Sequence, residues 1–167
     1  MLNVRQSPAP GLIALMLLYS SNSSAQTRPS PQEYVKYFGG KIIPPGKFEI
    51  DGKTVACGSR ATILDSHLQD ITAAYRQFAI VNPERFAKLS PTLKLWSFTV
   101  ACGVALLGPQ PTRADCYEVR RGKKEGWLSE EGMEQICTFI HPTPGRLDNQ
   151  VPGPERCMRM RRCYREG

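Results

Sequence analysis

The chain has 167 residues and a formal net charge of +7, from 22 Lys and Arg against 15 Asp and Glu. This length suits one domain with a proper core, because chains of this size bury roughly two-thirds of their unfolded surface. The sequence contains no P-loop, no glycine fingerprint for a dinucleotide and no G-x-S-x-G motif. It therefore gives no support to nucleotide-dependent chemistry or to a serine hydrolase of that type.

The first 25 residues predict a secretory signal peptide. Arg5 is their only charged residue, residues 11–19 form an apolar run, and Ser23 and Ala25 place small residues before a cleavage site that follows Ala25. The run is far shorter than the about 20 residues that span a bilayer. We expect an exported protein, periplasmic or extracellular, with a retained N-terminal anchor as the alternative. Cleavage removes Arg5 and no acidic residue, so it lowers the net charge from +7 to +6.

Residues 26–45 are expected to form a flexible leader ahead of a single domain at 46–167. The leader begins with polar residues and prolines, and its Gly-Gly and Pro-Pro-Gly sequences interrupt regular structure after one turn of helix at 34–38. The domain opens with KFEIDGKTVACG, which predicts two short strands around Asp51-Gly52. An Asp-Gly pair between such segments is a strong signal for a hairpin turn.

The middle of the chain predicts, in order, a segment compatible with a helix, a strand and two helices. Residues 67–78 are compatible with a helix, and the following FAIVNP predicts a buried strand that stops at Asn-Pro. Pro83 suits the first position of a short helix, and Ser90 is a favourable cap for a helix over 91–107. This central helix is apolar or neutral on every side over most of its length. Because it is too short to span a membrane, we expect it to be buried on all faces.

Helices account for most of the C-terminal third. Pro111 opens a helix that becomes basic at RRGKKEG, and Ser129 caps a helix at 130–140 with two acids in its first turn. A loop at 141–154 leads to an Arg-rich helix at 155–165. The order of hairpin, strand, central buried helix and further helices predicts an α+β domain with a short antiparallel sheet.

Six cysteines lie after the signal peptide, which indicates an oxidising compartment and up to three disulfides. They allow 15 pairings, and their spacing does not choose among them. A thiolate zinc site is disfavoured, because the shortest spacing is C-x5-C and not C-x2-C. The six are Cys57, Cys102, Cys116, Cys137, Cys157 and Cys163.

Several landmarks between about residues 55 and 165 carry a resemblance. They are ACGSR, VNPERFAKLSPTLKLW, Cys102-Gly103, ADC at 114–116, KEGWL at 124–128 and ERCMRMRRCY. On these landmarks the chain resembles small secreted bacterial proteins related to gluzincin-type zinc metallopeptidases. In that family a buried helix carries H-E-C-G-H, and a following helix carries Glu-x-x-x-Asp with the Asp inside A-D-C. The resemblance implies a small zincin-like α+β domain into which all six cysteines fit.

The residues at the family's catalytic positions differ from the motif. The resemblance places the two histidine ligands on Val100 and Val104, the general base on Ala101 and the third ligand on Pro111, and only Asp115 is kept. Zinc hydrolysis needs ligands with lone pairs and a carboxylate that takes a proton from the metal-bound water. Val, Ala and Pro supply neither. The resemblance therefore predicts a former active-site helix in which apolar side chains now fill the core, with no cofactor and no catalysis. The alternative is an ordinary helix with an apolar face and no catalytic ancestry.

A metal-dependent hydrolase or peptidase with relocated ligands is the enzymatic alternative. Its candidate ligands are His67, Asp115 and His141. The chain has only these two histidines, and neither has an acid or a cysteine at metal-ligand spacing. We therefore expect both histidines to lie on the surface or in loops.

Two basic clusters are the sequence's candidate binding surface. One contains Arg120, Arg121, Lys123 and Lys124, and the other contains Arg156, Arg159, Arg161, Arg162 and Arg165. We expect the second cluster, at the Arg-rich end, to dominate binding to anionic surfaces. In an exported protein they favour an anionic cell-envelope component or an acidic protein as partner, with a solvated face as the alternative. Nucleic acid is disfavoured, because aromatic residues do not alternate with the basic ones. The sequence thus predicts a non-catalytic envelope-binding or scaffolding domain, and a structural envelope protein without a ligand is the other non-enzymatic alternative.

Overall fold

The computed structural model describes residues 29–75, 77–108, 110–144 and 151–167, and the predicted signal peptide lies outside these residues. Six helices and six strands form in the described part of the chain. Their bounds, in chain order, are α1 Pro31–Phe38, β1 Lys41–Ile43, β2 Phe48–Ile50, β3 Lys53–Val55, β4 Ala61–Leu64, β5 Thr72–Tyr75, β6 Phe78–Val81, α2 Pro83–Ala87, α3 Pro91–Leu107, α4 Pro111–Lys124, α5 Glu130–Ile140 and α6 Gly153–Glu166.

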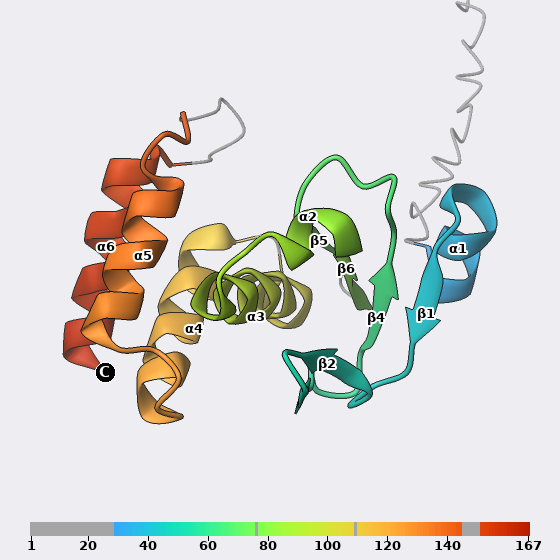
Figure 1. Cartoon of the computed structure of the whole chain (residues 1–167), viewed down its shortest axis with the longest axis horizontal. Helices are drawn as coiled ribbons and strands as arrows, with labels where there is room; N and C mark the ends of the chain where they lie inside the picture. Colours follow the sequence, from blue (N-terminus) through green and yellow to red (C-terminus); the bar gives the residue numbers. More distant parts are fainter. Residues whose placement is uncertain (1–28, 76, 109, 145–150) are drawn as a thin grey trace, which may run out of the picture.

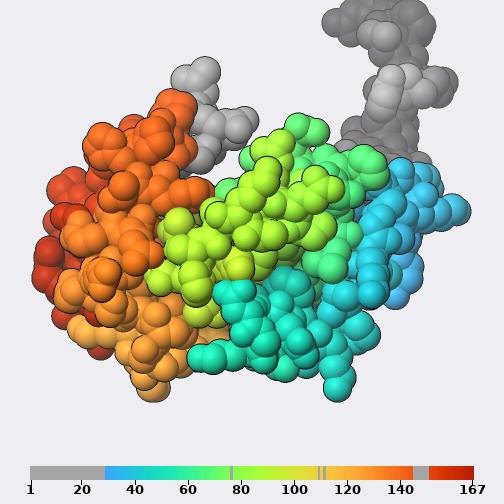
Figure 2. All heavy atoms as spheres, viewed as in Figure 1, coloured from blue at the N-terminus to red at the C-terminus, as the bar shows by residue number. Residues whose placement is uncertain are grey.

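Helix α3 is the central element of the molecule. The strands and α1 lie on one side of it, and α4, α5 and α6 lie on the other (Figure 1). In the space-filling view, the β2–β3 hairpin in teal borders the yellow-green segment of α2 and α3, which in turn borders the orange helices (Figure 2). This arrangement explains why α3 lacks a polar face, because it packs against the sheet and against the helices at once.

The main sheet has the strand order β1-β4-β6-β5. Strands β4 and β6 are parallel, whereas β1 and β5 pair antiparallel with their neighbours. Along β6, Phe78 and Ile80 join the cluster on the α1 side, and Ala79 and Val81 join the cluster on the α3 side. The strand is therefore buried on both faces with the period of two that a strand dictates. This confirms the buried strand predicted from FAIVNP.

Residues 30–43, which we expected to belong to a flexible leader, form α1 and β1 of the folded domain. Ser30 and Glu33 make a reciprocal capping box at the start of α1. The Tyr34 hydroxyl donates a hydrogen bond of 2.8 Å to the buried carboxylate of Asp65, and β1 pairs with β4. The capping box is a local signal that the sequence carries at Ser30 and Glu33. The contacts with Asp65 and β4 join residues far apart in the chain, which local composition does not show.

The helix expected at 67–78 is wrong. This segment contains a turn and then β5, which forms an edge of the sheet beside β6. The side chain of Thr72 lies within hydrogen-bond distance of the carbonyl and the hydroxyl of Ser97 in α3. Tertiary pairing therefore decides a segment whose local preference is weak. The sequence analysis also missed β4, which has only four residues.

The other predicted elements are confirmed. The β2–β3 hairpin turns at Asp51-Gly52, where both residues have positive φ, and Ser90 and Ser129 cap α3 and α5 through their side-chain oxygens. The last helix begins at Gly153, two residues earlier than expected. The class is α+β, as the sequence predicts. In the described part of the chain, no helix has both the length and the hydropathy to cross a bilayer.

All six cysteines are paired, as the sequence predicts. Cys57 bonds to Cys102 of α3, which fixes the hairpin region to the central helix. The other two bonds join α6 to its neighbours, α4 and α5. These pairs are Cys116–Cys163 and Cys137–Cys157. Each cross-link closes a loop of tens of residues and typically stabilises a fold by about 2–4 kcal/mol.

Candidate functional site

The positions that the resemblance assigns to catalysis are divided between two cores. Ala101 is buried in the cluster between α3 and the strands, whereas the partly buried Val100 packs against the cluster of α4, α5 and α6. Val104 is partly exposed near the end of α3, and Pro111 is the first residue of α4. The donor set does not fit a zinc ion, because none of these four side chains carries a lone pair suited to a metal.

Asp115, the one position at which the resemblance finds the motif's own residue, forms an ion pair. The Arg156 guanidinium from α6 donates two hydrogen bonds to its carboxylate, of 2.7 Å from Nε and 2.6 Å from Nη2. The same guanidinium lies over the Trp96 ring, with its carbon 5.2 Å from the ring centre. Trp96 and Val100 are one helical turn apart on α3. A cation supplied by α6 therefore stands beside the helix face on which the resemblance places the first metal ligand.

The two histidines are not brought together with Asp115 at a common site. His67 follows β4 beside Asp65, and its side chain is 82% exposed. His141 is exposed at the end of α5, in the helical half of the molecule. Among the described residues, no group of three His, Cys, Asp or Glu side chains has the arrangement of a metal site. The described residues therefore contain no set of metal ligands that would support the relocated-ligand hydrolase.

The five arginines of α6 do not act as one free surface. Arg156 is bound to Asp115, Arg159 pairs with Glu155, and Arg161 pairs with Glu134 of α5. Arg162 and Arg165 are exposed and have no hydrogen bond or ion pair within the described residues. Sequence analysis identified the cluster but could not separate these groups, because the partner of Arg161 comes from another helix.

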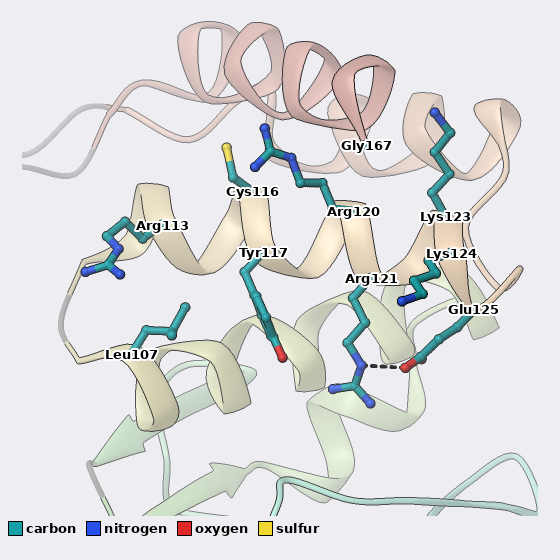
Figure 3. Close-up of a pocket in the computed structure, with 10 residues that line it drawn as sticks. All are labelled: Leu107, Arg113, Cys116, Tyr117, Arg120, Arg121, Lys123, Lys124, Glu125 and Gly167. Carbon is teal, nitrogen blue, oxygen red and sulfur yellow. Dashed lines mark hydrogen bonds and ion pairs between the residues drawn. The ribbon is translucent and has the colours of Figure 1, made fainter.

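An open groove of about 910 Å³ lies along α4 (Figure 3). Leu107, at the end of α3, and the C-terminal Gly167 contribute to its wall. Five of the lining side chains are cationic, and Glu125 carries the only side-chain carboxylate among them. The complete lining is Leu107, Arg113, Cys116, Tyr117, Arg120, Arg121, Lys123, Lys124, Glu125 and Gly167. The groove therefore gathers the first of the two predicted basic clusters and adds Arg113 and Tyr117, which the sequence analysis had not selected.

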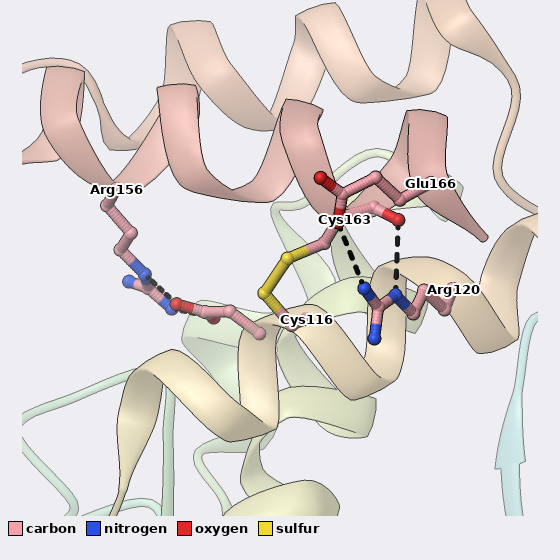
Figure 4. The surroundings of a disulfide bond; sticks show 6 residues. Cys116, Arg120, Arg156, Cys163 and Glu166 are labelled. Carbon is pink, nitrogen blue, oxygen red and sulfur yellow. Dashed lines mark hydrogen bonds and ion pairs between the residues drawn. A yellow bond between two sulfur atoms is a disulfide. The ribbon is translucent and has the colours of Figure 1, made fainter.

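Two of these cations hold α6 in place. Helices α4 and α6 lie side by side with their C-terminal ends together (Figure 4). Arg120 donates to the carbonyl of Cys163 and to the carboxylate of Glu166, and Lys123 donates to the carbonyl of Tyr164. Carbonyls in the last turn of a helix lack intrahelical donors and carry partial negative charge, so cations there are stabilising. Arg120 and Lys123 are thus already engaged in the fold.

The opposite face of α4 presents cations that are less engaged. Arg113, Tyr117, Arg121 and Lys124 follow one another at spacings of four, four and three, which places them on one side of the helix. Arg121 uses Nε for a 2.7 Å bond to Glu125, and its terminal nitrogens point away from that carboxylate (Figure 3). Arg113 makes one long hydrogen bond to Gln110, at 3.4 Å. These side chains retain free donors at the groove.

Glu118 is a buried acid that the sequence analysis missed. It is fully buried between α3 and α4, and neither carboxylate oxygen has a hydrogen-bond partner among the described residues. Burial raises the pKa of Glu118 to about 7, although the nearby Arg121 lowers it. A Cβ at Gly103 of α3 would lie 3.3 Å from its Oε1, so glycine there provides the space for the carboxyl group. Its spacing of four from Ala114 was the available signal, because that spacing puts it on the buried face.

Comparisons of the chain with family models, with curated proteins and with solved structures find no match. The resemblance to zinc metallopeptidases therefore rests on the sequence landmarks alone.

Proposed function

We propose that this chain is a non-catalytic exported domain that binds an anionic component of the cell envelope. The single observation that carries the proposal is the groove along α4, whose lining has five cationic side chains and one side-chain carboxylate, with two of the cations engaged by α6. A concave surface with one sign of charge concentrates oppositely charged ligands and speeds their association. Free donors on Arg113 and Arg121 supply the contacts such a ligand needs.

Two further observations support the other parts of the proposal. Val100, Ala101 and Val104 offer no group that binds a metal or moves a proton, and the carboxylate of Asp115 is engaged by Arg156. Three disulfides favour an oxidising compartment such as the periplasm or the extracellular space. Together they favour binding over catalysis and the envelope over the cytosol.

The test measures binding of the oxidised protein to anionic polymers and vesicles at several salt concentrations. The groove variant is Arg113→Gln, Arg121→Gln and Lys124→Gln, and its matched control is Arg159→Gln, Arg162→Gln and Arg165→Gln. Both remove three positive charges, so a purely global charge effect would weaken binding equally. We expect the groove variant alone to lose most of the affinity and to flatten its salt dependence, because screening acts on the charges that make contact.

Two results would contradict the proposal. If the unmodified protein binds no polyanion or anionic vesicle better than a neutral one at low salt, the binding function is wrong. If the α6 control loses affinity and the groove variant keeps it, the exposed arginines of α6 form the site and the groove does not.

A further inference from the structure

Along the free face of α4, one tyrosine lies between two arginines in the helical repeat. Arg113, Tyr117 and Arg121 are each separated by four residues. Because a helix rises 1.5 Å per residue, their Cα atoms advance by about 6 Å at each step. Tyr117 is 45% exposed, and it projects from α4 between Arg113 and Arg121 beside Leu107 (Figure 3). We call these three residues the α4 ridge.

The two kinds of side chain in the α4 ridge recognise different parts of a ligand. A guanidinium presents parallel N–H donors that match a carboxylate or a phosphate group. An exposed aromatic ring presents a flat, electron-rich face, which packs well against the polarised C–H groups of a sugar ring. A simple polyanion would contact only the arginines, whereas an anionic sugar chain would contact both the arginines and the tyrosine ring.

We propose that the α4 ridge binds an anionic glycan, with a sugar ring on Tyr117 and acidic groups on Arg113 and Arg121. This inference rests on the proposed function, since it names the class of anion that the same groove takes. Lys124 extends the row of charges by one turn. The order of cation, ring and cation matches a chain in which acidic groups flank a sugar.

The composition of the groove favours a glycan over a membrane or a nucleic acid. Membrane-surface elements insert a broad apolar face, but the apolar side chains here are Leu107 and Tyr117 together with the disulfide at Cys116. Single-stranded nucleic acid is held by several aromatic residues on which successive bases stack. Tyr117 is the only aromatic residue that lines the groove in the described part of the chain.

The experiment compares a short oligomer of guluronic acid with a polyphosphate of equal charge as probes of the oxidised protein. Tyr117→Ala should weaken binding of the oligouronate roughly fivefold to tenfold, which is the loss expected from one aromatic contact. Tyr117→Phe should retain the affinity, because it keeps the ring. Tyr37→Ala is the matched control, since it removes a more exposed ring from α1. Polyphosphate binding should depend on Arg113 and Arg121 but not on Tyr117.

The outcomes separate this inference from the proposed function. If both probes bind and Tyr117→Ala leaves both affinities unchanged, the glycan assignment is wrong while the anion-binding function stands. A single-stranded oligonucleotide and vesicles with phosphatidylglycerol are the competing probes. If either binds more tightly than the oligouronate and depends more strongly on Tyr117, the glycan assignment is overturned in favour of that ligand. If no probe binds, both proposals fail.

Discussion

Asp115 of α4 and Arg156 of α6 form a bidentate ion pair that is largely shielded from solvent. The two side chains are 4% and 18% exposed, and both hydrogen bonds are shorter than 2.8 Å. The Trp96 ring of α3 covers the guanidinium. Three helices therefore meet at one charge pair, and the pair fixes α6 against the face of α3 that the peptidase resemblance concerns.

Removing one partner of this pair should destabilise the fold strongly. Arg156→Met leaves the carboxylate of Asp115 buried without a counter-charge, which typically costs about 3–5 kcal/mol. We expect a decrease in the free energy of unfolding of that order, measured by urea denaturation of the oxidised protein. Arg162→Met is the control, because Arg162 is exposed and should change stability by less than about 0.5 kcal/mol. Equal stability of the two variants would show that the pair contributes little.

Glu118 should make the stability of the protein depend on pH. Burial raises the pKa of Glu118 in the folded state to about 7, from an ordinary value of 4.5. Between these two values the folded protein binds a proton that the unfolded chain has released, so stability falls as pH rises from 4.5 to about 7. The total loss is on the order of 3 kcal/mol. Above pH 7 this contribution levels off.

Glu118→Gln separates this effect from those of other carboxyl groups. Arg121 and Glu125 are the charged groups that influence Glu118 most, and both remain in the variant. Urea unfolding of the variant and of the unmodified protein at several pH values should give a difference that grows between pH 4.5 and 7. A constant difference across this range would show that Glu118 does not titrate there.

The purified protein should contain no stoichiometric zinc and should cleave no peptide. Val100, Ala101 and Val104 cannot hold a zinc ion that would lower the pKa of a bound water molecule, and they cannot accept that water's proton. Val100→His alone should recruit no metal and should reduce stability by about 1 kcal/mol, because it puts a polar ring into a partly buried apolar site. Elemental analysis is the measurement. One zinc per chain, removable by a chelator with loss of a hydrolytic activity, would direct the search to His67 and His141.

The disulfide pairing can be checked by mass spectrometry of unreduced protein. The oxidised mass should lie six hydrogens below the reduced mass, since three bonds form. Proteolytic fragments should be linked in the observed pairs and in no others. Cys57→Ala with Cys102→Ala should lower the free energy of unfolding by about 2–4 kcal/mol, because the segment between the two residues is no longer closed into a loop in the unfolded state. Six thiols that react with an alkylating reagent in folded protein would contradict the assignment.

Local signals predicted those parts of the fold that local interactions determine. Ser90 and Ser129 mark helix starts because their side chains bond to backbone amides three residues later. Strand β4 was missed because it is short and pairs with a strand that follows about 17 residues later. Strand β5 pairs with β6, which begins only three residues after β5 ends, and it was missed because its small residues have a weak local preference for a strand. The position of α1 likewise depends on the hydrogen bond between Tyr34 and Asp65, which are 31 residues apart.

The candidate site shows the same division between composition and geometry. The basic residues were evident from the sequence, but the sequence did not show which of them are free to bind a ligand and which are engaged within the fold. Arg156 and Lys123 lie in predicted clusters, yet both are engaged by residues about 40 positions away. Tyr117 and Glu118 are adjacent in sequence and have opposite fates, one at the groove and one in the core. The packing of α4 between α3 and α6 gives the two side chains these different surroundings.

The cross-links also limit how far the chain can be stretched. Two of them bridge segments with sequence separations of 45 and 47 residues, and the third lies within the second segment. A force applied between the chain ends passes through the sulfur atoms and bypasses both segments. At roughly 3.3–3.6 Å per residue, about 300 Å of contour length stays locked while the bonds are oxidised. Under such a force, the oxidised domain would lengthen only through the segments before Cys57 and after Cys163 and through the short connection between Cys102 and Cys116.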